Sequence, residues 1–143
     1  MRTIFFMILT CLLLSCNSKV ETGNYSIDKI EFYYIPFDIN IPIQSYESSL
    51  RVQKPDNVIT NKLIIEDIIE EVGEIQKNKT SESFNEGNVY LIIDFFDKNQ
   101  KKYSLLYDKR LFRLGEKTYS NVENIDVILN KVNIEENIHN GSD

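Results

Sequence analysis

The segment from Asn88 to Phe96 constrains the fold of this chain most, because both faces of the strand it would form are apolar. The alternating residues on one face are Val89, Leu91, Ile93 and Phe95, and those on the other are Tyr90, Ile92 and Phe96. A strand that is buried on both faces lies inside a sheet, with neighbours on either side. We therefore expect 88–96 to be the central strand of a sheet.

One carboxylate interrupts this apolar strand. Asp94 lies on the same face as Ile92 and Phe96, and a carboxylate that leaves water needs a partner. Two arrangements satisfy this requirement. Either the face opens to water near the end of the strand, or Asp94 forms an ion pair with a cation on the neighbouring strand, such as Lys102 or Arg113.

The other predicted strands are shorter. They cover 27–35, 48–53, 102–107 and 111–114. In the segment from Ser48 to Gln53 the alternation places Leu50 and Val52 inward. Tight turns join the last two strands to 88–96 and predict a meander, whereas 54–57 and 77–86 are polar connections. Residues 37–43 alternate apolar residues with polar residues or proline, which fits either an edge strand or an extended loop.

Two amphipathic helices complete the prediction. The helix from Asn61 to Gln76 carries an apolar stripe at helical spacing, made of Ile65, Ile68, Ile69, Val72 and Ile75. A second helix follows Ser120, which has capping-box spacing to Glu123, and it buries Val122, Ile125, Ile128, Leu129 and Val132. These elements predict an α+β fold in two layers, with a mostly antiparallel sheet of about four to six strands and two helices packed on one face.

The N-terminus is typical of an export signal. Met1-Arg2 is followed by an apolar run from Ile4 to Leu14, which at roughly 11 residues is too short to span about 30 Å of hydrocarbon. The run closes on Leu-Leu-Ser-Cys at 13–16, which resembles the lipobox of bacterial lipoproteins. The resemblance implies that Cys16 is lipidated, becomes the first mature residue and anchors the chain in the cell envelope. In a cell with two membranes we expect the outer one. An ordinary signal peptide with a chance cysteine is the alternative.

The domain organisation follows from this interpretation. Residues 1–15 are the lipoprotein signal peptide, and 16–25 are the lipidated cysteine with a short polar tether. Residues 26–134 form a single α+β domain, and 135–143 are expected to be a disordered tail.

Composition argues against several classes of function. The formal net charge is -6, and an acidic chain is a poor binder of nucleic acid, because phosphate contacts need clustered Lys and Arg. The single histidine, His139, lies in the polar tail, where no third group can hold it as a catalytic base. Both cysteines lie within the first 16 residues, so the mature domain has no thiol nucleophile or thiolate ligand. We therefore expect no catalytic residue, no metal site and no cofactor.

Two functional hypotheses remain. The first is a non-enzymatic binding or accessory module that docks a protein partner in the envelope, as an inhibitor or a self-protection factor. The charged residues that would dock the partner are Glu66, Glu70 and Glu74 on the first helix and Lys101 and Lys102 at a turn; a plainly solvated surface is the alternative interpretation. The second is a binder or sensor of a small apolar ligand held between sheet and helices. Its lining would be Tyr33, Tyr90, Phe96 and Tyr107, which core packing explains equally well.

The lipid anchor is directly testable. We expect Cys16→Ala to leave an unprocessed precursor or to release the domain from the membrane, because the acyl chains on Cys16 supply the attachment. Mass spectrometry of the mature wild-type protein checks this. An unmodified Cys16, or a mature N-terminus at another residue, would contradict the prediction.

Overall fold

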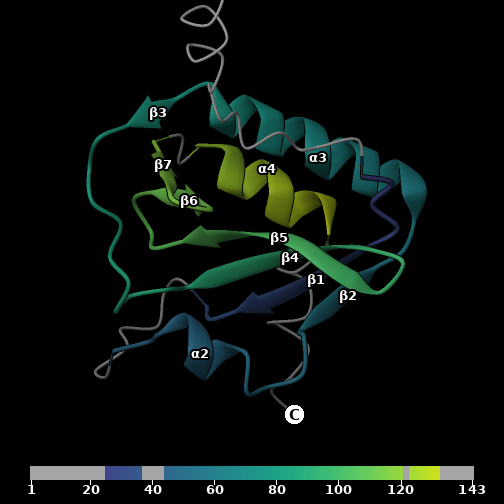
Figure 1. Ribbon diagram of the computed structural model, residues 1–143, viewed down its shortest axis with the longest axis horizontal. Helices are drawn as coiled ribbons and strands as arrows, with labels where there is room; N and C mark the ends of the chain where they lie inside the picture. Colours follow the sequence, from purple (N-terminus) through teal and green to yellow (C-terminus); the bar gives the residue numbers. More distant parts are fainter. Residues whose placement is uncertain (1–24, 37–43, 121–122, 133–143) are drawn as a thin grey trace, which may run out of the picture.

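A seven-stranded antiparallel sheet organises the chain (Figure 1). The structure is a computed structural model that describes residues 25–36, 44–120 and 123–132. Its strands are β1 Lys29–Tyr34, β2 Asn57–Ile59, β3 Lys79–Thr80, β4 Leu91–Asp97, β5 Gln100–Tyr107, β6 Phe112–Leu114 and β7 Lys117–Tyr119. Its helices are α2 Glu47–Leu50, α3 Lys62–Gln76 and α4 Glu123–Lys131. Within the described ranges no helix is long and apolar enough to cross a membrane.

Strand β4 lies between β1 and β5, near the middle of the strand order β2-β1-β4-β5-β6-β7-β3. This confirms the central strand predicted from its two apolar faces. Strands β4 and β5 are joined by a two-residue turn in which Lys98 and Asn99 have φ of 50° and 65°. Positive φ at both central residues is typical of the type I′ turn, whose twist matches that of paired strands.

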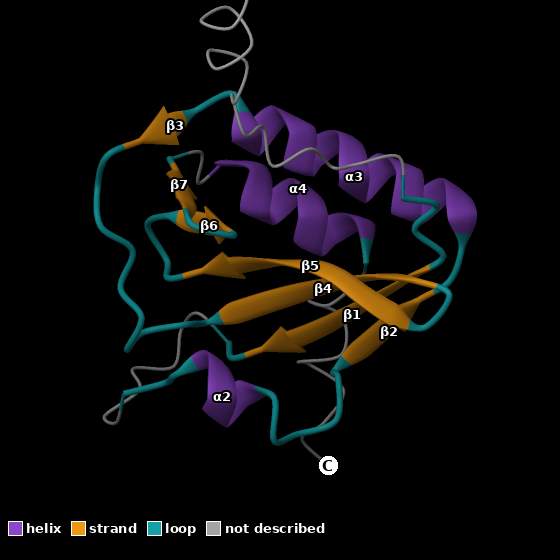
Figure 2. Ribbon diagram, viewed as in Figure 1, coloured by secondary structure: helices purple, strands orange, loops and turns teal. Residues whose placement is uncertain are grey.

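The two faces of the sheet are covered differently (Figure 2). Helices α3 and α4 pack on one face, where Ile68, Val72 and Ile128 join alternate strand residues such as Ile93 and Leu105 in the larger apolar cluster. On the opposite face a smaller cluster contains Leu50, Val89, Ile92 and Leu106. This second cluster lies beneath α2 and explains why β4 is apolar on both sides.

The predicted fold class is confirmed. The chain is an α+β protein with an antiparallel sheet, and α3 and α4 both pack on one face. The sheet has seven strands instead of about four to six, because β2, β3 and β7 contain only two or three residues each. Such short strands are set by the neighbours they pair with, and they are too short to show an alternating pattern in the sequence.

One element was predicted wrongly. The segment predicted as a strand at Ser48–Gln53 begins instead with the helical turn α2, where the amides of Ser49 and Leu50 both donate to the carbonyl of Tyr46. Leu50 is buried as expected, but Val52 is 86 % exposed. A short run with two apolar residues does not distinguish a strand from one helical turn, because periodicity needs length.

Several predicted features lie outside the described residues. They are the signal and anchor at 1–16, the tether up to residue 24, the segment 37–43, Val122 and the tail with His139.

The core packing of α3 gives a stability prediction. Ile68 is fully buried between α3 and the sheet, whereas Leu63 on the same helix is 72 % exposed. We expect Ile68→Ala to lower the free energy of unfolding by about 2–5 kcal/mol, because it removes buried methylenes and leaves a cavity. Leu63→Ala is the matched control and should cost less than about 0.5 kcal/mol. Urea unfolding measures both, and equal losses would show that the buried face of α3 is misassigned.

Candidate functional site

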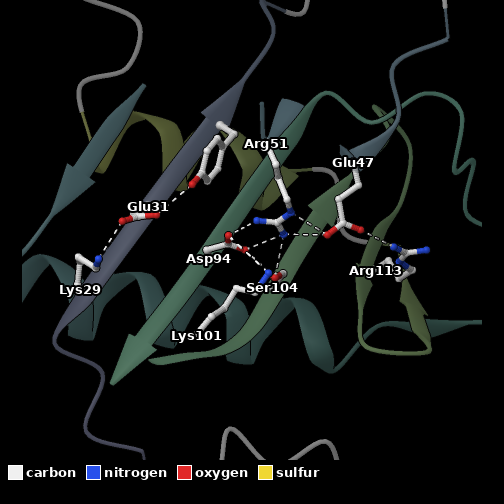
Figure 3. Close-up of polar contacts among 9 residues, drawn as sticks. Lys29, Glu31, Glu47, Arg51, Asp94, Lys101, Ser104 and Arg113 are labelled. Atoms are coloured by element: carbon white, nitrogen blue, oxygen red, sulfur yellow. Dashed lines mark hydrogen bonds and ion pairs between the residues drawn. The ribbon is translucent and has the colours of Figure 1, made fainter. Parts of the chain in front are cut away.

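A cluster of charged side chains occupies the sheet face opposite α3 and α4 (Figure 3). We call it the Arg51 cluster, and its members are Glu47, Arg51, Asp94, Ser104 and Arg113. Helix α2 supplies Glu47 and ends just before Arg51, and β4, β5 and β6 supply the other three. The cluster therefore joins segments that lie far apart in the sequence.

Asp94 is the buried member of the cluster, with only 2 % of its side chain exposed. Arg51 meets it with two guanidinium nitrogens: Nη2 lies 2.9 Å from Oδ1, and Nη1 donates to Oδ2. The Ser104 hydroxyl donates to Oδ1 over 2.6 Å. Bidentate hydrogen bonds between arginine and carboxylate fix the orientation of both groups as well as pairing their charges. Asp94 therefore holds Arg51 in one position over the sheet.

Glu47 connects the two arginines of the cluster. Its Oε1 accepts from Nε and Nη2 of Arg51 at 3.0 and 2.8 Å, and its Oε2 accepts from Arg113 at 3.3 Å. Arg113 also pairs with Glu86, and its guanidinium stacks over the Phe84 ring. The guanidinium of Arg51 lies 5.7 Å from the ring centre of Tyr33. Each of these charges is thus neutralised within the cluster or at its rim.

Strand register explains how the strand members meet. Asp94 is paired with Ser104 on β5 and with Glu31 on β1, so these side chains form one row across the sheet. Arg51 reaches this row from above because it follows Glu47 by four residues, one helical turn. The helical form of α2 is therefore needed for the cluster to form.

Two groups in and beside the Arg51 cluster have raised pKa values. Burial of the Arg51 guanidinium opposes its charge, but its hydrogen bonds to Asp94 and Glu47 outweigh burial and raise its pKa above the usual range. Burial of the Tyr33 hydroxyl, together with its hydrogen bond to Glu31, raises the pKa of Tyr33 to about 12. Both groups therefore keep their protons at neutral pH and act as fixed donors.

The structure corrects the expected surroundings of Asp94. The face does not open to water at this point. Asp94 is ion-paired, as the second alternative expected, but its partners are Arg51 and, on the neighbouring strand β5, Lys101 instead of Lys102 or Arg113. A β-bulge between Phe95 and Phe96 sets Lys101 opposite Phe96, so the Lys101 ammonium lies 3.9 Å from Asp94.

The two expected cations have other partners. Lys102 lies 4.0 Å from Asp97, and Arg113 pairs with Glu47 and Glu86. Arg51, the true partner of Asp94, was missed because its segment was predicted as a strand. Its spacing of four residues from Glu47 was the signal that could have found it.

The four aromatic residues predicted to line a ligand gap do not share one space. Tyr107 belongs to the apolar cluster under α3 and α4. Tyr33 lies on the opposite face, against the smaller cluster. Phe96 contacts the Lys29 ammonium at 4.2 Å from its ring centre, and Tyr90 contacts Lys109 at 3.9 Å.

The charged residues predicted to dock a partner lie in two separate regions. Glu66, Glu70 and Glu74, which we call the acidic row, are exposed along α3. Lys101 is exposed and Lys102 half-buried at the start of β5, beside the β4–β5 turn. The acidic row is therefore continuous along one helix, while the two lysines belong to the end of the sheet.

Two shallow grooves flank Glu47. One, of about 390 Å³, is lined by Tyr46, Glu47, Ser48, Arg51 and Glu86. The other, of about 370 Å³, is lined by Glu47, Lys102, Tyr103, Ser104, Leu106, Arg113 and Gly115. Across the part of the chain that the structure describes, no group of three or more His, Cys, Asp or Glu residues could hold a metal ion. Both grooves are open surface depressions beside an already paired carboxylate.

Searches against protein-family models, curated proteins and solved structures found no match to this chain.

The Arg51 cluster gives a prediction about stability. Arg51→Met keeps an apolar stem but removes both guanidinium contacts to the buried carboxylate of Asp94, which is left with the Ser104 hydroxyl and the more distant Lys101 ammonium at 3.9 Å. We expect it to lower the free energy of unfolding by about 3 kcal/mol, the lower end of the range for breaking a buried ion pair. The double variant Arg51→Met/Asp94→Asn should recover most of this loss, because no unpaired charge then remains. Urea unfolding of the single and double variants measures the coupling.

Lys62→Met is the control for this pair of variants. Lys62 lies 3.6 Å from Glu66 in an exposed ion pair, and its loss should cost less than about 0.5 kcal/mol. An Arg51→Met loss no greater than that of the control, or additive effects in the double variant, would contradict the structural role of the pair.

Proposed function

We propose that this chain is a lipid-anchored protein of the bacterial cell envelope, and that its domain is a non-enzymatic module that docks a protein partner. An inhibitor or a self-protection factor fits this description. The anchor in the proposal is the lipid on Cys16. The docking surface is the acidic row on α3.

The pairing of the Arg51 cluster is the observation that carries the non-enzymatic part. Enzymes that use a serine or a carboxylate leave the group within reach of substrate and hold a base beside it. Here Ser104 donates to Asp94, and Asp94 is occupied by Arg51. Both polar groups are therefore engaged in stabilising the placement of α2, which supports a role based on surface recognition.

The acidic row supports recognition by charge. Glu66, Glu70 and Glu74 point away from the core on the solvated side of α3, four residues apart. Lys62 and Lys77 contact the first and last of them, and Glu70 lies between. A row of exposed carboxylates on a rigid helix speeds encounters with a basic surface and is screened by salt.

Reversal of the acidic row tests the proposal. The partner is first isolated by crosslinking and pull-down of the lipidated protein from its own envelope, and identified by mass spectrometry. We then expect Glu66→Lys/Glu70→Lys/Glu74→Lys to slow association with the purified partner about tenfold or more and to leave the fold intact. The wild-type association rate should fall as salt rises above about 0.15 M, where the Debye length is about 8 Å. Biosensor kinetics measure both effects.

The control carries the same charge change elsewhere. Glu82→Lys/Glu116→Lys/Glu123→Lys alters three exposed acids outside the row and should change the rate only slightly. Lys101→Glu/Lys102→Glu tests the basic residues separately. Association that is insensitive to salt and to reversal of the row would contradict docking by this surface.

A further inference from the structure

We infer that residues 46–55 form a lid that opens away from the sheet while the core under α3 and α4 stays folded. We call this segment the α2 lid, because it contains α2 and the turn that follows it. The ion pair between Arg51 and Asp94 is the latch that holds the lid closed (Figure 3). The opening needs neither the lipid anchor nor a protein partner, so it goes beyond the proposed function.

The two ends of the α2 lid are fixed to the sheet by backbone hydrogen bonds. Before the lid, the amide of Ser45 donates to the carbonyl of Gly87 at 3.0 Å, and the amide of Val89 donates to the carbonyl of Ser45 at 2.8 Å. After the lid, the amide of Asp56 donates to the carbonyl of Phe32 at 2.8 Å. Ser45 and Asp56 are therefore the two hinge points of the lid.

Between these points the α2 lid contacts the sheet through few side chains. Leu50 is its one buried residue, at 4 % exposure, and it packs in the smaller apolar cluster. Helices α3 and α4 pack closely on each other, whereas α2 has few close backbone contacts with any other element. A segment held by few buried apolar contacts opens at a lower free energy than the core of the domain. The exposed residues of the lid are Tyr46, Ser48, Ser49, Val52, Gln53 and Lys54.

The latch fixes where the lid closes and still permits opening. Arg51 and Asp94 attract each other, but both lose water when the lid is closed, and this loss offsets much of the attraction. When the lid opens, both charges regain water, so the open form contains no buried charge without a partner. The second contact of the lid, from Glu47 to Arg113 at 3.3 Å, joins side chains that are 35 % and 20 % exposed. Water screens such a pair, so it adds little resistance to opening.

Opening changes one face of the sheet. The smaller apolar cluster loses Leu50, which exposes the aliphatic side chains of Val89, Ile92 and Leu106. Among the described residues, the larger cluster contains none from the α2 lid, so α3 and α4 keep their packing. The groove of about 370 Å³ already reaches Leu106. The open lid therefore extends this groove over an apolar floor, and the latch controls access to that floor.

Thiol labelling at two neighbouring positions of β4 tests the inference. Ile92 and Ile93 are both 0 % exposed, but Ile92 lies under the α2 lid and Ile93 lies under α3 and α4. Ile92→Cys and Ile93→Cys are made separately in the full-length protein, which is isolated in detergent and treated with dilute iodoacetamide. Peptide mass spectrometry gives the labelling rate at each position and separates it from labelling of the native cysteines. Each rate is proportional to the population in which that position is accessible.

We expect position 92 to be labelled about tenfold or more faster than position 93, because the lid opens more often than the whole domain unfolds. Urea below the unfolding transition should speed labelling steeply at position 93 and only weakly at position 92, since opening the lid exposes much less surface than global unfolding. Similar rates at the two positions, or equal urea dependences, would overturn the inference.

Two further substitutions act differently on the two positions. Ile68→Ala weakens packing under α3 that is the same with the lid open or closed. It should speed labelling at position 93 about tenfold or more and leave position 92 unchanged. Leu63→Ala, on the exposed side of α3, is the matched control and should change neither rate. Equal acceleration of both positions by Ile68→Ala would show that access to position 92 needs global unfolding, and would overturn the inference.

Arg51→Met tests the latch itself. It leaves Asp94 without its guanidinium partner only while the lid is closed, so it should speed labelling at position 92 about tenfold or more. An unchanged rate at position 92 would overturn the assignment of Arg51 as the latch. Circular dichroism shows whether this variant folds. If it does not fold, the comparison of positions 92 and 93 with and without Ile68→Ala decides the inference.

Discussion

The ion pair between Arg51 and Asp94 is the constraint on which the rest of this structure depends. The central strand β4 is covered on both faces, and it carries a carboxylate in the covered region. Such a charge is tolerated only beside a fixed partner of opposite sign. Because Arg51 follows α2, satisfying Asp94 also places α2, and with it Leu50, over the smaller apolar cluster.

The pair contributes more to specificity than to net stability. A buried ion pair gains little over an apolar pair of similar size, but a buried charge that loses its partner is strongly penalised. Any placement of α2 that separates Arg51 from Asp94 therefore incurs that penalty. Glu47 fixes α2 relative to β6 in the same way, because it accepts hydrogen bonds from both Arg51 and Arg113. The Arg51 cluster fixes the position of α2, whereas the face covered by α3 and α4 contains most of the buried apolar residues.

The proposed function therefore depends on exposed residues. With the Arg51 cluster engaged in holding α2, the proposed docking surface uses exposed charges elsewhere, in the acidic row of α3. A row of exposed carboxylates on a rigid helix suits a protein partner with a basic surface.

The sequence by itself determined the elements that are long enough to show a hydrophobic periodicity. These are the central strand, the apolar stripe of α3 and the buried residues of α4, and together they determined the α+β class. The strands β2, β3 and β7, the helical form of α2 and the partner of Asp94 were decided by tertiary structure. Strands of two or three residues exist only through their pairing, and α2 is held by contacts with β4 and β5 that are 43 and 53 residues away in the chain. The local sequence pattern indicates which side of an element is apolar. The partner of a buried charge depends instead on which segments the fold brings together.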